Sequence, residues 1–308
     1  MTSTAHTEQP IVLPPAAAGE QRLKLLAKQF VSSKLAVFGA VVFIIMVLAA
    51  IFAPALAPQN PYDLRVLNIM NSFVEPGGEG FTGERFWLGT DAQGRDMYSG
   101  MLYGLRISLV VGIGSAIVAC LIGASLGLLA GYAGGRTDTL IMRLVDLHLS
   151  FPTILIALMI LAFLGTGLMN VIIAIIIVEW AYYARTVRAT AMVERQREYI
   201  EAADSLVLSR TRILFRHLLP NCLPPLIVIA TIQVARAISL EATLSFLGLG
   251  VPITEPSLGL LISNGYQHVI SGRYWISFYP GLVLLVLIVS INLVGDHLRE
   301  IMNPRNQK

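Results

Sequence analysis

Charged residues are scarce in this 308-residue chain, where Asp, Glu, Lys and Arg together make up only 13% of the sequence. A soluble globular domain carries about 25% charged residues. Hydrophobic residues, by contrast, make up 55% of this chain. The composition therefore indicates an integral membrane protein. The formal net charge of +3 is too small to imply a nucleic-acid partner.

Motifs that bind nucleotides or metals are also missing. None of the four lysines follows a glycine, so the chain lacks the phosphate-binding sequence GxxxxGK[ST]. The five histidines show no spacing typical of metal ligands, and Cys120 and Cys222 form no CxxC motif. We interpret the cysteines as packing residues. We expect that this chain is not an enzyme and binds no metal or cofactor.

Long apolar runs are abundant, and six of them approach the length of about 20 residues that a helix needs to cross a membrane. They cover residues 35–56, 107–130, 150–164, 169–184, 226–249 and 278–294. The third and fourth runs are short, and they reach full length only by recruiting flanking residues such as 140–149 and 185–187. Gly165-Thr166-Gly167 predicts a tight turn between them. The sequence thus predicts an all-α polytopic membrane protein with six transmembrane helices.

Lysine and arginine are distributed unequally between the two sides of these spans. With the N-terminus inside, the inner segments hold 16 of the 22 residues and the outer segments hold 5. The positive-inside rule therefore places both termini in the cytoplasm. The first run is too long for a signal peptide, and we interpret it as an uncleaved span. The expected parts are a cytoplasmic tail, a first helix, a periplasmic loop, a core of five helices and a second tail, at residues 1–34, 35–56, 57–106, 107–300 and 301–308.

The outer loop ends in LGTDAQGRDMYSGMLYGLR, residues 88–106. Asp91 is a candidate helix cap and Gly94 a candidate turn residue. We therefore expect a helix to begin near Arg95 and to continue into the second span. A direct contact with substrate is the alternative interpretation of this motif.

One charged segment, from Arg197 to Asn221, separates the fourth and fifth runs. Apolar and small residues recur in it at three- and four-residue steps, which predicts two short helices joined by a bend at residues 207–209. Ser209 is expected to cap the second helix and Pro220 to end it. We expect the bend at Val207 to have a negative φ, because a β-branched residue adopts a positive φ only with strain.

The first of these two helices has a face that suits contact with another protein. Ala202 and Ala203 are small enough to let a partner surface approach closely. Glu201 and Asp204 offer acceptors to an arginine on that surface. The physical alternative is an amphipathic loop that lies on anionic lipid, which the arginines of the segment would favour.

The same segment resembles the EAA loop of bacterial ABC-importer permeases. That family has the letters EAA, then a Gly four residues after them, then a Leu-Pro pair. The matching positions in this chain are Glu201, Ala202, Ala203, Leu219 and Pro220, whereas Val207 replaces the Gly. Five further segments are similar to the dipeptide, oligopeptide and nickel subgroup of C-type permease subunits. They read LGTDAQGRD, GYAGGRTDTLIMRLVDLHLSFP, YARTVRA, ATLSFLGLG and NLVGDHLRE.

The resemblance implies the type I ABC importer (MetI-like) permease fold and a place in the bacterial inner membrane. It implies a peptide transporter whose other parts are a second homologous permease, two cytoplasmic ATPase subunits that use ATP and Mg, and an extracytoplasmic substrate-binding protein. A nickel complex, glutathione or an opine-like compound stays open as the cargo. The EAA loop, residues 194–221, would dock on an ATPase. Its expected coupling residues are Glu201, Ala202, Ala203, Asp204, Val207, Leu219 and Pro220.

Two rival classes also fit a polytopic chain. A secondary transporter driven by an ion gradient would need its own coupling-ion site and often shows inverted repeats, and we find neither in the sequence. A membrane scaffold without transport activity is the other rival. Copurified ATPase subunits would separate these alternatives from an ABC permease.

Polar residues within the fifth run are candidates for function, because a charge at the bilayer centre costs at least about 2.5 kcal/mol. Ser239 and Thr243 follow Arg236 at i+3 and i+7, on the same helix face. Glu241 is about 140° round the helix from Arg236, so the two do not pair within the helix. We expect these residues to line the translocation pathway or to contact the partner permease, with a static interhelix ion pair as the alternative. Structural pairing nearer the cytoplasmic ends is expected for Asp146, His148 and Glu179.

Small residues repeat every four positions in the second span. They are Ala119, Gly123, Gly127 and Gly131. Such a face lets two helices in a membrane approach closely. The repeat predicts a static packing contact rather than a moving gate.

Overall fold

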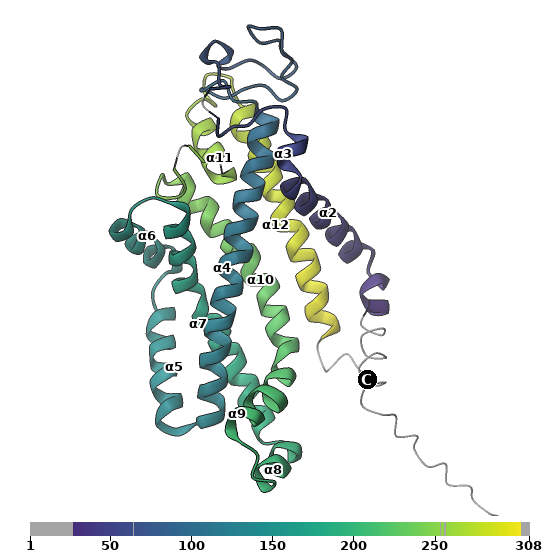
Figure 1. The fold of residues 1–308 in the computed structure, drawn as a ribbon, viewed down its shortest axis with the longest axis vertical. Coiled ribbons are helices and arrows are strands. Elements are labelled where there is room, and N and C mark those ends of the chain that lie inside the picture. The colour runs from purple at the N-terminus through teal and green to yellow at the C-terminus, as the bar shows by residue number, and fades with distance from the viewer. Residues whose placement is uncertain (1–26, 64, 253, 256, 303–308) are drawn as a thin grey trace, which may run out of the picture.

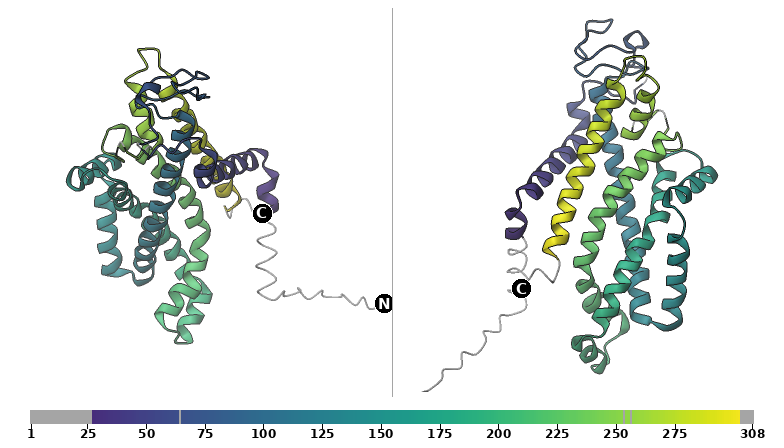
Figure 2. Two further views of the ribbon diagram at one scale, coloured as in Figure 1. Left: turned by 45° about the horizontal axis from the view of Figure 1, so that its top comes forward. Right: turned by 180° about the vertical axis from the view of Figure 1, so that it is seen from behind.

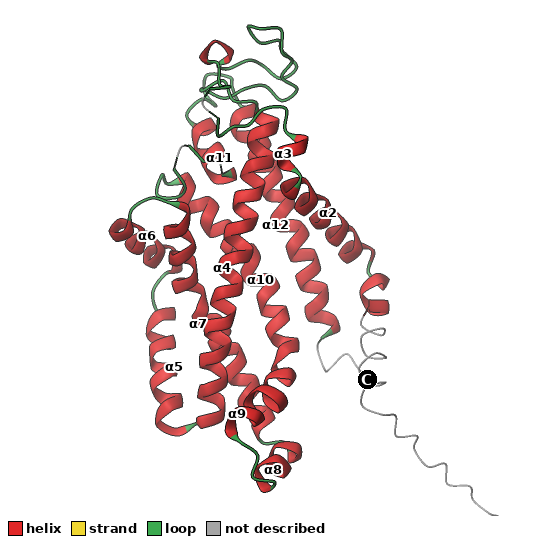
Figure 3. Cartoon of the chain, in the orientation of Figure 1, coloured by secondary structure: helices red, strands yellow, loops and turns green. Residues whose placement is uncertain are grey.

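The computed structural model describes residues 27–302, except residues 64, 253 and 256, and at Asp204 only the backbone. Most of the expected N-terminal tail, residues 1–34, and of the C-terminal tail, residues 301–308, lies outside this part. All the regular elements that it describes are helices, apart from two isolated bridges in the outer loop. Figures 1 and 3 show the helices side by side, with loops gathered at the two ends of the bundle. The all-α prediction is confirmed.

Five helices in the described part are long and apolar enough to cross a membrane. They are α2 (Lys34–Ile51), α4 (Met97–Ala133), α7 (Leu168–Arg195), α10 (Leu219–Phe246) and α12 (Trp275–Ile301). They correspond to the first, second, fourth, fifth and sixth expected spans. α4 has 37 residues. At 1.5 Å per residue it is about 55 Å long, well beyond an apolar core of about 30 Å.

The third expected span is a bent pair instead of one straight helix. α5 (Gly135–Leu149) and α6 (Thr153–Leu164) meet at 89°, so a sixth span exists only if the pair is counted as one. Pro152 lacks an N–H group and disfavours helical geometry at Phe151, which explains the break. α6 therefore projects away from the bundle (Figure 1). Beyond it, the predicted turn is confirmed, with φ of 81° at Gly165 and 150° at Gly167.

Six shorter elements lie between these helices, and residues 27–32 before α2 are also helical. The six elements are α3 (Ala53–Leu56), the 3₁₀ turn η1 (Ile69–Asn71), α8 (Glu198–Ser205), α9 (Arg210–Arg212), the π-helical turn η2 (Ile213–Leu218) and α11 (Leu258–Tyr266). The views in Figure 2 show α2 alongside α12. This contact is close, because a Cβ on Gly39 would lie 2.8 Å from the Cβ of Leu293.

The outer loop leads into α4 nearly as the sequence predicts. The helix begins at Met97, where the Asp96 carboxylate accepts a hydrogen bond from the backbone N–H of Ser99 (2.8 Å). Asp96 is therefore the cap, and the prediction that Asp91 has this role is wrong. The Asp91 carboxylate instead accepts from the backbone N–H of Arg95 (2.9 Å) and closes the turn before the helix.

The small-residue face of α4 packs against α7, as expected. A Cβ on Gly123 would lie 2.6 Å from the Cβ of Tyr183, and one on Gly131 would lie 2.7 Å from the Cβ of Ala191. A Cβ on Gly127 would overlap the backbone of Ala184. The two helix backbones are therefore in direct contact over two turns, with no room for a side chain between them.

Gly127→Val should strongly destabilise the protein, because the added side chain has to push α4 and α7 apart. Overpacking of this kind costs about 1–3 kcal/mol, and more where backbone is the obstacle. Gly114→Ala on the same helix is the matched control, since a Cβ there meets nothing within 4 Å. Thermal unfolding in detergent should show a lower midpoint for Gly127→Val alone. Equal midpoints for the two variants would contradict the close contact.

Candidate functional site

A cavity of about 470 Å³ lies among α6, α7, α10 and α12. Arg236, Ser239 and Thr243 all contribute to its lining, so the polar face expected on the fifth span is real and faces this cavity. The other polar residues of the lining are Thr153, Glu179 and Asn292. Apolar side chains from α6, α10 and α12 complete the walls.

The guanidinium of Arg236 is held in place on one side of the cavity. Its Nη2 donates to the hydroxyl of Tyr182 (3.1 Å), and its Nη1 donates to the side-chain oxygen of Gln233 (3.3 Å). The guanidinium carbon also lies 4.3 Å from the ring centroid of Tyr182, a cation–π contact. The hydroxyls of Tyr182 and Thr153 are 3.4 Å apart. A long, flexible side chain is thereby restricted to one orientation.

Glu179 lies on the same face of α7 as Tyr182, one turn away. Its side chain is only 2% exposed, and its Oε2 atom has no hydrogen-bond partner among the described residues. It lies eleven residues after the start of the 28-residue helix, and the structural pairing expected for it is absent from the ion pairs of the described residues. The signal that could have found it is a carboxylate inside an apolar run.

Asp146 and His148 do make the structural contacts that the sequence predicts. Arg185 on α7 donates from Nη2 to Asp146 Oδ1 (2.6 Å), and His148 Nε2 lies 3.2 Å from the carbonyl oxygen of Val178. Both contacts join α5 to α7, outside the cavity.

Glu241 differs from the other expected pathway residues, because it is fully buried and does not line the cavity. Ser108 donates to its Oε2 (2.9 Å), and Ser245 donates to its Oε1 (2.8 Å). The side chain thus joins α4 to α10 within the bundle.

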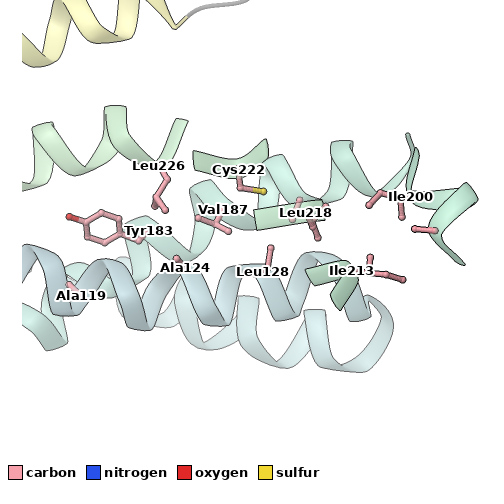
Figure 4. Packing of buried hydrophobic residues seen from close by; sticks show 12 residues of the cluster. Ala119, Ala124, Leu128, Tyr183, Val187, Ile200, Ile213, Leu218, Cys222 and Leu226 are labelled. Carbon is pink, nitrogen blue, oxygen red and sulfur yellow. The ribbon is translucent and has the colours of Figure 1, made fainter. Parts of the chain in front are cut away.

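The EAA segment is anchored by buried apolar residues at one end of the molecule. Ile200 and Ala203 of α8 are 1% and 4% exposed and belong to the same cluster as Leu128 and Val187, on α4 and α7 (Figure 4). Glu201 and Ala202 face solvent, as does Pro220, whereas Leu219 is half-buried. The two alanines that were expected to form one docking face therefore point in different directions.

Val207 has a φ of 53°, so the prediction of a negative φ is wrong. The reason is the way α8 ends. The backbone N–H of Leu208 donates to the carbonyl of Ala203 (3.3 Å), which places Val207 at the left-handed position of a Schellman motif. Glycine is preferred there, and a valine costs of order 1–3 kcal/mol. The side chain is 88% exposed, so it meets no steric obstacle.

The second helix of the segment continues into the membrane instead of ending. Ser209 precedes α9 but makes no side-chain capping hydrogen bond, and Pro220 lies in the first turn of α10. Ser209 therefore has the expected N-cap position but no side-chain hydrogen bond there, whereas the prediction that Pro220 ends the helix is wrong. A proline donates no hydrogen bond to the preceding turn, and the π-helical geometry of η2 just before it accommodates that loss.

Tyr199 connects α8 to the two long helices on either side of it. Its hydroxyl donates to Glu194 on α7 (2.7 Å) and accepts from the side-chain amide of Asn221 on α10 (3.2 Å). Burial, together with the hydrogen bond to Glu194, raises the pKa of Tyr199. The hydroxyl therefore stays protonated and keeps both hydrogen bonds. Through Tyr199, α8 is hydrogen-bonded to both α7 and α10, the helices that carry Glu179 and Arg236.

Comparison with known proteins identifies the family. The family model described as "Binding-protein-dependent transport system inner membrane component" matches residues 123–308. The chain belongs to this family. The model described as "N-terminal TM domain of oligopeptide transport permease C" matches residues 22–73 of the permease. Within the described ranges, no group of three or more His, Cys, Asp or Glu side chains is placed to hold a metal ion.

Similar permeases carry names from peptide transport. The di/tripeptide transport system permease protein DppC of Pseudomonas aeruginosa is 39% identical over 92% of each chain. The probable D,D-dipeptide transport system permease protein DdpC of Escherichia coli is 36% identical over 89% of this chain and 88% of its own. The oligopeptide transport system permease protein OppC of Bacillus subtilis is 35% identical over 91% and 88%.

A solved structure supports the fold of the permease. A chain of the MetNI methionine ABC transporter, in an inward-facing conformation, aligns with a TM-score of 0.55 and 22% identity. The alignment covers 67% of this permease and 97% of that chain. The type I importer (MetI-like) permease fold is therefore confirmed.

Proposed function

We propose that this permease is the C-type membrane subunit of an ATP-driven importer for dipeptides and oligopeptides. The similarity to DppC of Pseudomonas aeruginosa over 92% of both chains carries this proposal. A polar cavity between membrane-spanning helices supports it, because a peptide needs hydrogen-bonding groups along its path. The alternative cargo is a nickel complex, glutathione or an opine-like compound. Uptake measurements with each compound would distinguish these cargoes from peptides.

The remaining parts of the importer are other chains. They are a second homologous permease that pairs with this one, two cytoplasmic ATPase subunits and an extracytoplasmic substrate-binding protein. ATP and Mg are used by the ATPases, since this chain lacks the phosphate-binding sequence GxxxxGK[ST]. The assembly lies in a bacterial inner membrane, with both termini of this chain in the cytoplasm. Along the chain, a cytoplasmic tail is followed by the first helix, a periplasmic loop, a core of five helices and a second cytoplasmic tail.

Two sets of residues have separate roles in this subunit, one in the passage of cargo and one in contact with the ATPase. Cargo moves past Arg236, Ser239 and Thr243, while buried Glu241 holds α4 against α10. The ATPase contacts the exposed side of the EAA segment through Glu201, Ala202 and Val207, and Asp204 adds a carboxylate to the same helix. Ala203, Leu219 and Pro220 support this surface from the inside or from the start of α10.

Reconstitution tests the proposed function. The permease complex is purified by a tag on this chain, inserted into liposomes and supplied with binding protein and radiolabelled dialanine. We expect ATPase subunits to copurify with the tagged chain. Uptake should require ATP on the side of the liposome membrane where the ATPases lie. Uptake that an ion gradient alone drives, with no ATPase present, would identify a secondary transporter instead. ATP-dependent uptake of a nickel complex but not of dialanine would correct the cargo.

The membrane orientation gives a separate prediction. Thr82 and Ser209 are both exposed, at opposite ends of the bundle. Single cysteines at these positions, in a background without Cys120 and Cys222, should react differently with an impermeant maleimide. Thr82→Cys should label when the periplasmic side is accessible, and Ser209→Cys only after lysis. Labelling of both from the same side contradicts the proposed topology.

A further inference from the structure

The cavity contains two opposite charges at the same depth of the bundle. Glu179 lies eleven residues after the start of α7, and Arg236 lies ten residues before the end of α10. These two helix ends are adjacent, because the backbone N–H of Gly167 donates to the carbonyl of Gly250 (3.1 Å). Both side chains line the same cavity. The fold thus brings an acidic and a basic side chain to the lining of one cavity, away from the ends of both helices.

These two charges do not neutralise each other directly. The ion pairs formed by the described residues do not include Glu179 with Arg236. The hydrogen bonds of Arg236 to Tyr182 and Gln233 use two of the five N–H donors of a guanidinium. Glu179 Oε2 is buried and has no hydrogen-bond partner among the described residues. Burial of a carboxylate oxygen without a partner is costly, and a ligand that brings a positive group to it would offset that cost.

We propose that Glu179 and Arg236 form a binding site for the two charged ends of a short zwitterionic peptide. The peptide ammonium pairs with Glu179, and the peptide carboxylate pairs with Arg236. A guanidinium fork matches a carboxylate with two parallel hydrogen bonds, and Tyr182 already fixes the orientation of this one. The cavity of about 470 Å³ is within the range of small-molecule sites. The site rests on the proposed function in peptide transport and adds a mode of recognition to it.

The other residues of the cavity lining suit the middle of a peptide. The hydroxyl of Ser239 and the side-chain amide of Asn292 offer hydrogen bonds to a peptide group, while Ile154 and Leu240 give apolar surface for side chains. Recognition of the two ends makes the site tolerant of peptide sequence. The fixed spacing of the charges on two helices makes it selective for length and for free termini.

The site is tested by combining substitutions in the protein with peptides that are blocked at one end. The purified permease complex, in nanodiscs and without binding protein or nucleotide, is titrated with dialanine, N-acetyl-dialanine and dialanine amide. Binding is followed by saturation-transfer NMR, which detects weak ligands. In the wild type, each blocked peptide should bind about tenfold or more weakly than dialanine, as expected for the loss of a charge-assisted hydrogen bond. Glu179→Gln should remove the preference for a free ammonium, and Arg236→Gln the preference for a free carboxylate.

Controls distinguish recognition of the ends from a structural effect. Arg185→Gln and Glu75→Gln remove one charge of each sign at exposed positions outside the cavity, and both should keep the wild-type preferences. The site is wrong if the wild type binds the three peptides equally or binds none of them. It is also wrong if Glu179→Gln weakens all three by the same factor, because that outcome means a packing role. ATP-dependent uptake in liposomes is measured in parallel. Normal uptake with no end preference overturns this site and leaves the proposed transport function intact.

Discussion

Replacing Glu201 with lysine is expected to reduce ATP-dependent uptake at least tenfold and to release the ATPase subunits during purification. Glu201 is exposed on α8, and its side chain makes no hydrogen bond or ion pair within the described part of the chain. The change therefore breaks no contact that folds the permease. A reversed charge at a docking surface costs several kcal/mol when it meets a like charge. The measurements are ATPase retention on the tagged complex and uptake of radiolabelled dialanine.

Two further variants make this result specific. Glu75→Lys causes the same change in net charge on an exposed residue of the outer loop, and it should keep ATPase retention at the wild-type level. Val207→Gly should also be tolerated, because glycine adopts the observed φ of 53° without strain. Normal retention with Glu201→Lys removes the docking role from α8. Loss of retention with Val207→Gly would mean that the valine side chain is itself a contact.

Glu241→Ala is expected to be the most destabilising change in the membrane-spanning part. It leaves the hydroxyls of Ser108 and Ser245 without their acceptor and opens a void between α4 and α10. Unpaired buried hydroxyls and a cavity together cost about 2–5 kcal/mol. The amount of folded complex and its thermal midpoint in detergent should both fall.

The matched variant is Glu241→Gln, which fills the same volume and keeps groups that hydrogen-bond both serines. Stability and uptake should stay close to wild type, because the proposed role of Glu241 is to hold two helices together. If Glu241→Gln folds normally but loses uptake, then the charge itself takes part in transport. The sequence-based assignment of Glu241 to the pathway would then be right.

Sequence patterns predicted the helices well where one physical requirement dominated. Apolar length alone located the spans that became α2, α4, α7, α10 and α12, because a membrane leaves the backbone few alternatives. Helical spacing also predicted directly that Arg236, Ser239 and Thr243 share one face of α10. The break before Pro152 was missed, because the sequence analysis joined residues 140–149 and 150–164 into one span, whereas the two helices meet at 89°.

Other features of the site depended on contacts that no local pattern reports. The left-handed φ of Val207 follows from how α8 ends, and residue preference alone favoured the opposite conformation. Pro220 suggested a helix end, yet a π-helical turn before it lets the helix continue. Glu179 and Glu241 look alike as carboxylates in apolar runs. Only the three-dimensional arrangement separates the one that faces a cavity from the one that serines enclose.

The direct contact between α4 and α7 has a mechanical consequence. With Gly123 and Gly127 against the opposing backbone, neither helix is free to rotate or slide past the other, so the pair behaves as one rigid wall. α10 packs against both helices. Its first part follows the π-helical turn η2 and contains Pro224 and Pro225, so regular backbone hydrogen bonds are interrupted there. A force applied through α8 would therefore be taken up as bending of α10 at this point. Such bending would change the separation between Arg236 on α10 and Glu179 on α7.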